Sequence, residues 1–349
     1  MRFPERPPLH DTGTSAGTHS PRLPRQGARG MALITAMLTV ALIATLAATA
    51  LWQQWRSLQV ETAERQRQQS VWLLTGALDW ARLILREDGR SGNTDHLGEP
   101  WALPLQEARL SSFLASSSDG VSEDDAAMAD RVFLSGQILD LQARLNVFNL
   151  MQGDQASAPD LAAFGRLFEL LGLPRAALDS LVQQLLAAQR TDSRLLLPQR
   201  FSQLNWMGLS PLQLARLEPF ITWLPVRTNV NLNTAPPEVL YASVPQLPLA
   251  QAQRAVQLRD SQHWRTLEEA TRALGDAGAG LAANLHGVST NYVEVIGRVR
   301  LGSTTLTERS VIQRDENQRV LWRERGTLAT PSRPTGDGAS RMPTASGTP

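Results

Sequence analysis

The long apolar stretch near the N-terminus constrains this chain more than any other feature of its sequence. Residues 30–55 contain no charged side chain, and residues 31–51 form a run of 21 apolar or small residues. As a helix with a rise of about 1.5 Å per residue, this run would be about 32 Å long, which matches the hydrocarbon core of a bilayer. Five arginines and only two acidic residues precede it, so the positive-inside rule predicts a cytoplasmic N-terminus. We therefore expect everything after Leu51 to be exported.

The apolar run alone leaves three interpretations of this segment open. It can be a single-pass anchor that follows an unstructured tail. It can be a secretory signal, with the small-x-small triplet at residues 48–50 as its cleavage site. It can also resemble the class III leaders that prepilin peptidase removes from pilins and pseudopilins, with the cut after Gly30. In that third case the apolar helix stays on the mature protein, which begins at Met31.

Composition limits what the exported part can be. The 349 residues are enough for two domains besides the membrane segment. The chain has no cysteine, so disulfides and thiolate metal sites cannot hold it together. A formal net charge of +1 gives no overall field that would attract nucleic acid or anionic lipid. Residues 1–29 and 327–349 have the composition of disordered segments.

The sequence does not indicate an enzyme. It contains no His-Glu-x-x-His motif, and because it has no lysine it contains no Walker-type phosphate loop. None of the five histidines lies four residues from another, so no helical histidine pair is available for a metal. We expect His263 and His286 to be surface or helix-end residues.

A helical pattern continues beyond the apolar run. Residues 56–87 contain no proline and one glycine, and from Val71 onward apolar residues recur at spacings of three and four. This pattern predicts a single helix of about 55 residues that ends at Asp88 and Gly89.

Alternating residues predict a small sheet. Near the C-terminus, Tyr292–Leu301, Thr304–Gln313 and residues 319–323 have the pattern of three strands, separated by the turn sequences LGS and RDEN. Residues 131–151 also alternate, and we expect a hairpin there that turns near Gly136 or Asp140. The long helix and these strands can form one helix-on-sheet layer.

Two further segments have their own composition. Residues 154–288 are rich in leucine and alanine and are punctuated by proline, which predicts a helical insert of six segments, one of them over residues 210–224. The acidic run SDGVSEDDAAMAD at residues 118–130 offers several carboxylates that could bind calcium. Its spacing fits no EF-hand loop, and a solvated acidic loop is the alternative.

Two motifs carry a resemblance to a known family. GQILDLQARLNVFNL at residues 136–150 and TWLPVRTNVNLNTAPPEVLYASV at residues 222–244 resemble the protein K family of the type II secretion system, also called general secretion pathway protein K, which are minor pseudopilins. The resemblance covers nearly the whole chain from about residue 25 to 325. It implies an α+β fold, with a pilin-like long N-terminal helix packed on a small antiparallel sheet and an inserted all-α domain of the SAM or helix-hairpin-helix type.

The resemblance also implies a division of the chain. The expected parts are residues 1–30, a cytoplasmic leader that is cleaved; 31–55, the transmembrane part of the N-terminal helix; 56–153, the first part of the pilin-like domain; 154–288, the inserted helical domain; 289–326, the C-terminal strands of the pilin-like domain; and 327–349, a disordered tail.

Three residues gain roles from the resemblance. It implies cleavage by prepilin peptidase between Gly30 and Met31, and N-methylation of Met31. Most pilins and pseudopilins carry glutamate at the fifth mature position, where it neutralises the N-terminal amine of a neighbour. Thr35 stands at that position here, as the family's lack of this glutamate implies, and this fits a subunit with no neighbour above it.

The implied function is structural. The family caps the tip of the pseudopilus and initiates its assembly, for export of folded proteins across the outer membrane. The implied partners are the I-type and J-type minor pseudopilins, the major pseudopilin, prepilin peptidase and the inner-membrane assembly platform, with calcium as a possible cofactor. The implied location is the inner membrane, single-pass, with the body of the chain in the periplasm.

One alternative comes from the same motif. The region that begins NVNLNTAPPEVL also resembles the helix-hairpin-helix of DNA-uptake proteins, which would make the chain a membrane-anchored DNA-binding protein. Such hairpins need glycine so that backbone N–H groups can approach phosphate. This chain has VPQLPLAQA there, with Pro245 and Pro248 and no glycine. We therefore expect no nucleic acid partner and assign the module to protein interaction.

Overall fold

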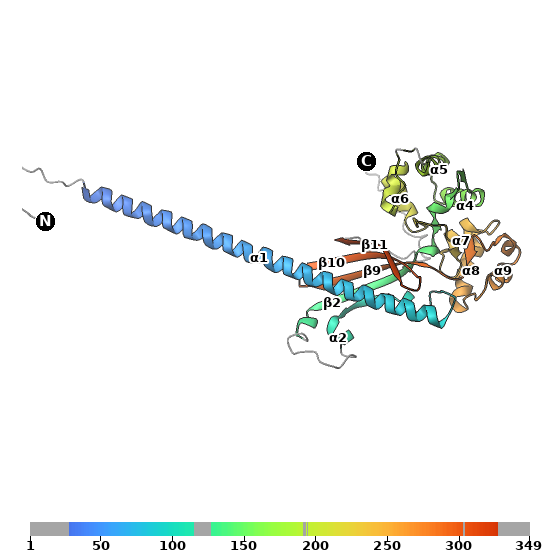
Figure 1. Cartoon of the computed structure of the whole chain (residues 1–349), viewed down its shortest axis with the longest axis horizontal. Helices are drawn as coiled ribbons and strands as arrows, with labels where there is room; N and C mark the ends of the chain where they lie inside the picture. Colours follow the sequence, from blue (N-terminus) through green and yellow to red (C-terminus); the bar gives the residue numbers. More distant parts are fainter. Residues whose placement is uncertain (1–27, 115–126, 191–192, 194, 303, 327–349) are drawn as a thin grey trace, which may run out of the picture. The chain divides into compact units, whose positions relative to one another are not determined.

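The computed structural model describes residues 28–114, 127–190, 193, 195–302 and 304–326. The chain forms two compact units, Met1–Thr62 and Ala63–Pro349. In the first unit the described residues belong to one helix, α1 (Ala28–Ser91), which continues into the second unit (Figure 1).

Helix α1 confirms the prediction of one continuous N-terminal helix. It has 64 residues and ends at Ser91, slightly later than the predicted stop at Asp88 and Gly89. Within the part of the chain that the structure describes, α1 is the one helix long and apolar enough to cross a membrane. Its side chains from Met31 to Thr62 are exposed.

A five-stranded antiparallel sheet is the centre of the second unit. The strand order is β1-β2-β9-β10-β11, and every neighbouring pair is antiparallel (Figure 1). The strands are β1 (Leu105–Arg109), β2 (Val132–Asp140), β9 (Tyr292–Leu301), β10 (Thr304–Gln313) and β11 (Arg319–Gly326). The bounds of β9 and β10 are those predicted from sequence, and β11 extends three residues beyond its predicted end.

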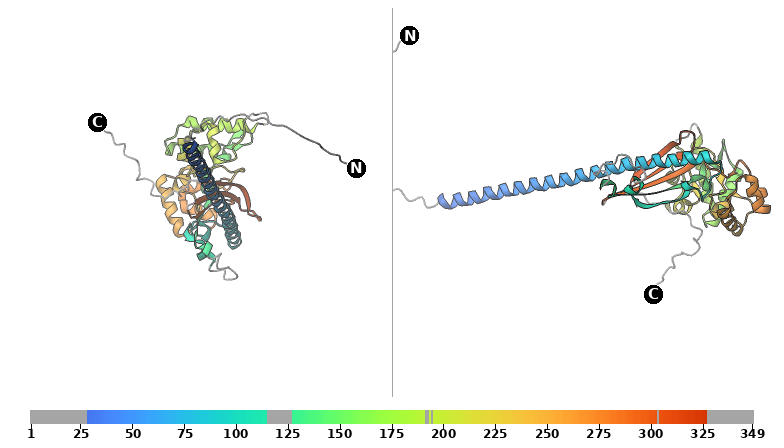
Figure 2. Two further views of the ribbon diagram at one scale, coloured as in Figure 1. Left: turned by 90° about the vertical axis from the view of Figure 1, so that its left-hand side faces the viewer. Right: turned by 90° about the horizontal axis from the view of Figure 1, so that it is seen from below.

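The C-terminal half of α1 packs along one face of this sheet (Figures 1 and 2). Leu78, Ala81 and Leu85 of α1 share one buried cluster with side chains of β2, β9 and β10, among them Val293 and Val295. The apolar spacing of three and four along α1 therefore marks the face that rests on the sheet, as predicted.

The predicted hairpin within residues 131–151 is wrong. β2 continues straight through Gly136, which pairs with Gly297 of β9. A Cβ atom at Gly136 would lie 2.8 Å from the carbonyl oxygen of Ile296, so this glycine allows a close approach of two strands and not a turn. At the end of the strand, the Asp140 carboxylate accepts a bond from the backbone N–H of Gln142 and caps a short 3-10 helix.

Between β2 and β9 the described residues form six α-helices, as many as the sequence predicts. They are α4 (Ala158–Leu170), α5 (Arg175–Gln189), α6 (Pro211–Leu217), α7 (Pro237–Ser243), α8 (Leu249–Ser261) and α9 (Leu267–Leu274). Two pairs of parallel two-residue strands connect distant parts of this segment. β3 (Leu145–Asn146) pairs with β6 (Ile221–Thr222), and β7 (Val230–Asn231) pairs with β8 (His286–Gly287). The remaining short elements are η1 (Pro100–Ala102), α2 (Leu110–Leu114), η2 (Leu141–Ala143), η3 (Val147–Leu150), β4 (Met151–Gln152), β5 (Gln155–Ala156), η4 (Phe201–Met207) and η5 (Gly275–Gly280).

One predicted helix is too long. We expected residues 210–224 to be helical, but α6 ends at Leu217 and the chain turns into strand β6. Pro219 explains the stop, because proline has no N–H to donate to the carbonyl oxygen four residues earlier. The start of α6 follows its sequence signals, with Ser210 and Gln213 forming a capping box.

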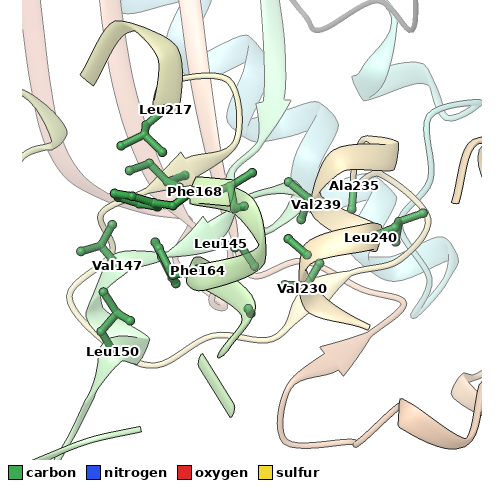
Figure 3. Close-up of a cluster of buried hydrophobic side chains, with 14 of the residues drawn as sticks. Leu145, Val147, Leu150, Phe164, Phe168, Leu217, Val230, Ala235, Val239 and Leu240 are labelled. Carbon is green, nitrogen blue, oxygen red and sulfur yellow. The ribbon is translucent and has the colours of Figure 1, made fainter. Parts of the chain in front are cut away.

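The six helices share a large apolar core. Phe164 and Phe168 of α4 are 1% exposed and contact residues from several segments of the insert (Figure 3). Val239 and Leu240 of α7 belong to the same cluster and are fully buried. The leucine-rich composition of residues 154–288 is therefore used to build a second core, separate from the clusters between α1 and the sheet.

Candidate functional site

The predicted leader junction lies in the first turn of α1. The helix begins at Ala28, so Gly30 and Met31 are both helical. Thr35 Oγ1 donates to the carbonyl oxygens of Met31 and Ala32, each at 3.0 Å. The Thr35 hydroxyl is thus satisfied within its own helix and needs no partner in hydrocarbon. Cleavage after Gly30 and methylation of Met31 stay predictions.

An exposed apolar stripe follows the outer face of the C-terminal half of α1. Trp72 is 75% exposed, Trp80 48% and Leu83 57%. Gly76 lies between the two tryptophans, and a Cβ atom there would meet nothing within 4 Å. The spacings of four, four and three put these four residues on one face of the helix. We call Trp72, Gly76, Trp80 and Leu83 the α1 stripe.

The α1 stripe makes this half of the helix apolar on two faces. One face is buried on the sheet through Leu78 and Leu85, and the stripe lies on the other. Two large aromatic side chains, each more than 45% exposed, lie on this one helix face, and aromatic residues are enriched in the cores of protein interfaces. The stripe is therefore the strongest candidate for binding another protein.

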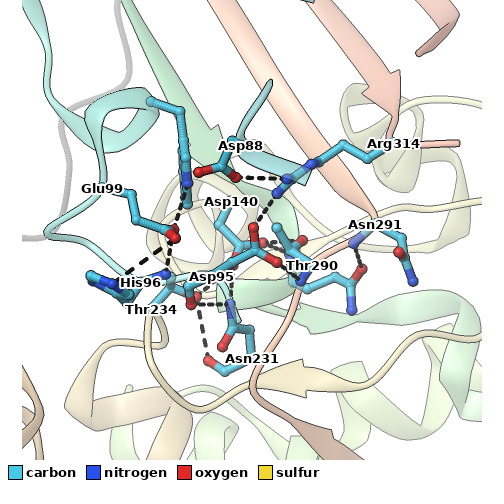
Figure 4. Close-up of polar contacts among 12 residues, drawn as sticks. Asp88, Asp95, His96, Glu99, Asp140, Asn231, Thr234, Thr290, Asn291 and Arg314 are labelled. Carbon is cyan, nitrogen blue, oxygen red and sulfur yellow. Dashed lines mark hydrogen bonds and ion pairs between the residues drawn. The ribbon is translucent and has the colours of Figure 1, made fainter. Parts of the chain in front are cut away.

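A buried polar junction joins the sheet to the insert around Asp140 (Figure 4). Asp140 is 6% exposed and ends strand β2. Its Oδ1 accepts bonds from Gln142 N and Thr290 Oγ1, each at 2.7 Å. Its Oδ2 accepts bonds from Asn231 Nδ2 at 2.9 Å and Thr234 Oγ1 at 2.5 Å. Burial raises the pKa of the Asp140 carboxyl, while the bonds from Thr234, Thr290 and Asn231 act in the opposite direction.

The polar residues of the NVNLNT motif therefore have structural roles. Asn231 reaches Asp140, and Asn233 exchanges two bonds with the backbone of Trp264, at 2.8 and 2.9 Å. The guanidinium of Arg259, which is buried, donates to the carbonyl oxygen of Leu232. The sequence singled out this motif correctly but gave no sign that Asp140 is its partner, because the two are about 90 residues apart.

Three carboxylates next to this junction could be mistaken for a metal site. Ligand oxygens of Asp88, Asp95 and Glu99 lie within 4.8 Å of one another. The guanidinium of Arg314 pairs with Asp88 at 2.8 Å and also with Asp95 (Figure 4). Since a cation already occupies the space between two of the carboxylates, the residues form an ion-pair cluster and do not fit a calcium site. Burial and the charges of Glu99 and Asp95 nevertheless raise the pKa of Asp88 to about 6, against the effect of Arg314.

The calcium-binding expectation for residues 118–130 concerns a different segment. Residues 118–126 of that run lie outside the described residues. Calcium binding there stays a prediction.

The histidines are placed differently from expectation. His263 lies two residues after the end of α8, as predicted, and its ring stacks on His96 with centroids 3.7 Å apart. The prediction for His286 is wrong: it lies in strand β8 and is 1% exposed, with Nδ1 accepting a bond from Ala282 N at 3.1 Å. Burial lowers the pKa of both His263 and His286. A histidine in a strand of two residues has no periodic pattern that would reveal its burial.

Comparison with known proteins points to one family. The family described as "Type II secretion system (T2SS), protein K" matches residues 230–289, which include most of the NVNLNT motif. The type II secretion system protein K of Pseudomonas aeruginosa is 28% identical over 342 residues, which cover 89% of this chain and 97% of that protein. The protein of the same name from Pectobacterium carotovorum is 24% identical over 336 residues, covering 88% of this chain and 99% of that one.

A solved structure shares the fold. A chain of the GspK–GspI–GspJ complex from the type 2 secretion system of enterotoxigenic Escherichia coli aligns with a TM-score of 0.56 and 17% identity. The alignment covers 76% of this chain and 99% of that chain.

Proposed function

Since the chain belongs to the type II secretion system protein K family, we propose that it is the minor pseudopilin that caps the pseudopilus tip and initiates its assembly. In this role it serves the export of folded proteins across the outer membrane as a structural component, without catalysis. The I-type and J-type minor pseudopilins are its direct partners, as the GspK–GspI–GspJ complex of the structural neighbour suggests. Its other proposed partners are the major pseudopilin, the inner-membrane assembly platform and prepilin peptidase.

The proposed topology follows from α1. Its apolar first half crosses the inner membrane once, with the arginine-rich N-terminus in the cytoplasm and the sheet and insert in the periplasm. Prepilin peptidase cuts after Gly30 and methylates the new amine of Met31. N-terminal sequencing of the membrane-extracted protein tests this proposal. A first residue other than methylated Met31 contradicts it, and Gly30→Leu should leave the precursor uncut.

The observation that carries the assembly proposal is the α1 stripe. It lies on α1, the helix whose first half is the proposed membrane span, so a partner anchored in the same membrane can place its own helix against it. Trp72 and Trp80 supply large apolar rings, and Gly76 between them leaves room for a side chain of that helix. A partner helix would therefore bury the stripe.

Copurification tests the stripe. The full chain is expressed with tagged I-type and J-type subunits, extracted in mild detergent and recovered through the tags. The double replacement Trp72→Ser and Trp80→Ser should remove the chain from the complex. Leu258→Ser, which changes a 58% exposed leucine on α8, is the matched control and should leave recovery unchanged. Equal recovery of the stripe variant and the control would show that the stripe is not the interface.

The DNA-binding alternative is not favoured. Of the basic residues near the hairpin-like region, Arg259 is 4% exposed and bonded to the carbonyl oxygen of Leu232. It cannot reach a phosphate without breaking that contact. Between α7 and α8 the chain carries Pro245 and Pro248, which lack the N–H donors that a phosphate-binding hairpin uses.

A further inference from the structure

A pocket of about 250 Å³ lies between α1 and the face of the sheet on which α1 packs. Gly136 of β2 and Gly297 of β9, which are direct partners in the sheet, form part of its floor. Gly136 lies two residues before Ile138, which packs against α1, so both are on the same face of the strand. Ala77 and Ala81 of α1 also line the pocket. The space exists because small residues stand on both the helix and the sheet.

The mouth of this pocket lies beside the α1 stripe. Four of its lining residues are exposed, and all four are apolar. Trp80 is 48% exposed and Leu103 64%, and Pro100 and Pro104 are also exposed. Trp80 belongs to the α1 stripe, whereas the other three lie in η1 and the residues that lead from it to β1. The pocket therefore opens between α1 and residues 100–104, and the stripe forms one side of its rim.

The lining suits an apolar group and not a charged one. No basic side chain is among the described residues that line the pocket. Its buried carboxylate, Glu308 of β10, is already paired with two arginines of β11: Nε of Arg323 lies 3.2 Å from Oε1, and Arg325 contacts Oε2. Ser310 Oγ donates to Oε1 at 3.2 Å. A fatty acid or other anion would find no cation here and would be repelled by Glu308.

We propose that the pocket receives one aromatic side chain from the helix of a partner minor pseudopilin that lies on the α1 stripe. This inference rests on the assembly role proposed above and adds the group that the partner must supply. An apolar cavity of about 150 Å³ is enough to hold benzene, so this one accommodates a phenylalanine or tryptophan ring. The ring enters between Trp80 and Leu103 and fills the space over Gly136 and Gly297.

The position of the mouth identifies the occupant. Trp80 is part of both the stripe and the rim, so a helix that covers the stripe also covers the mouth. Gly76 lies one helical turn before Trp80. A partner residue that packs at Gly76 therefore has a neighbour, one turn along its own helix, at the level of the mouth. An aromatic anchor seated in a pocket at the centre of an interface is the usual form of a binding hot spot.

The first test fills the pocket and keeps the stripe. Ala77→Phe places a ring in the pocket and leaves Trp72 and Trp80 unchanged. The full chain is copurified in mild detergent with the tagged I-type or J-type subunit, each in turn. Recovery of Ala77→Phe should fall about tenfold or more with the subunit that supplies the ring. Ala77→Leu should give a smaller loss, and Ala176→Phe, at an exposed position of α5, should give none.

The second test needs no bulky replacement. The chain has no cysteine, so Ala77→Cys introduces its only thiol, and this thiol lies in the pocket. Its alkylation by N-ethylmaleimide, followed by mass spectrometry of this chain, should be about tenfold or more slower when the partner subunit is bound. Ala250→Cys places the control thiol at an exposed position of α8 and should react at the same rate in both states.

The outcomes separate this inference from the assembly proposal. The pocket inference is wrong if folded Ala77→Phe is recovered as well as Ala176→Phe, even where the thiol is protected, because the partner then covers the mouth without entering it. It is also wrong if the partner does not slow alkylation of the Ala77→Cys thiol. Normal recovery of Ala77→Phe together with loss of the double variant Trp72→Ser and Trp80→Ser leaves the assembly proposal standing. Normal recovery of that double variant as well would overturn both.

Discussion

Replacing Asp140 by asparagine tests the buried junction between the sheet and the insert. The carboxylate accepts four bonds, two on each oxygen, from Gln142, Thr290, Asn231 and Thr234. An asparagine has the same shape but only one acceptor oxygen, so two of the four donors would face an NH₂ group. Each lost bond to a charged acceptor is worth about 1.5–3 kcal/mol.

The gross loss of about 3–6 kcal/mol is partly offset. Asparagine carries no charge, so the cost of burying the carboxylate disappears, and a threonine hydroxyl can rotate to accept a bond from the new amide. We therefore expect Asp140→Asn to lower the free energy of unfolding by about 2–4 kcal/mol at pH 7. Urea unfolding of the full chain in detergent, followed by tryptophan fluorescence, measures this difference.

The matched control is Asp276→Asn, which makes the same chemical change at an exposed position in η5. It should alter the free energy of unfolding by less than about 0.5 kcal/mol. The double variant of Asp140→Asn with Thr234→Val should cost less than the sum of the two single changes, because both remove the same 2.5 Å bond. An Asp140→Asn protein as stable as the control, or strict additivity with Thr234→Val, would refute the assigned role of the junction.

The sign of the pH dependence provides a second check on Asp140. Because burial raises the pKa of the folded carboxyl, the folded state holds a proton at pH values where the unfolded state has lost it. The contribution of Asp140 to stability is therefore largest at low pH and decreases as the pH rises through the folded pKa. Asp140→Asn should remove that part of the slope.

Three further predictions concern other residues. The pKa of Asp88 is about 6 in the folded protein and 3.8 as an unperturbed group. The free energy of unfolding should therefore fall by at most about 3 kcal/mol as the pH rises from 4 to 6. Urea unfolding curves of Asp88→Asn at these two pH values should lack that fall. The full chain should show no steeply salt-dependent binding to duplex DNA in a fluorescence titration, since Arg259 is engaged internally. If residues 118–130 bind calcium, the unfolding midpoint in a thermal-shift series should rise when calcium is added and return to its starting value with chelator. An unfolding midpoint that calcium does not change would contradict calcium binding.

Much of the fold could be predicted from local sequence pattern. Strands β9 and β10 alternate regularly and are bounded by short turn sequences, so their ends were found to the residue. The long helix was visible because residues 31–87 contain no proline and follow helical spacing in their second half. Strand β1 was missed because Leu105–Arg109 has only five residues and an irregular pairing with β2.

The candidate sites were less predictable, because they depend on contacts between distant segments. Asp140 meets Thr234 and Thr290, which are 94 and 150 residues further along the chain. No periodicity connects such partners. Gly136 is a second case in which a distant segment decides the local structure. Glycine inside a strand pattern indicates either a turn or a close approach of two backbones. Only the pairing of Gly136 with β9 decides between them.

The stripe and Thr35 bear on different parts of the proposed assembly. Thr35 bonds to its own helix, so the membrane segment offers no side-chain charge at the fifth position to a neighbour's amine. In the proposed assembly, apolar contact outside the membrane is then one source of attraction between subunits. At 75% and 48% exposure, Trp72 and Trp80 present on the order of 250 Å² of surface, worth about 6 kcal/mol on burial before the cost of association. Loss of that contribution is large enough to dissociate a complex of ordinary affinity, which is why the two tryptophans are the decisive residues to change.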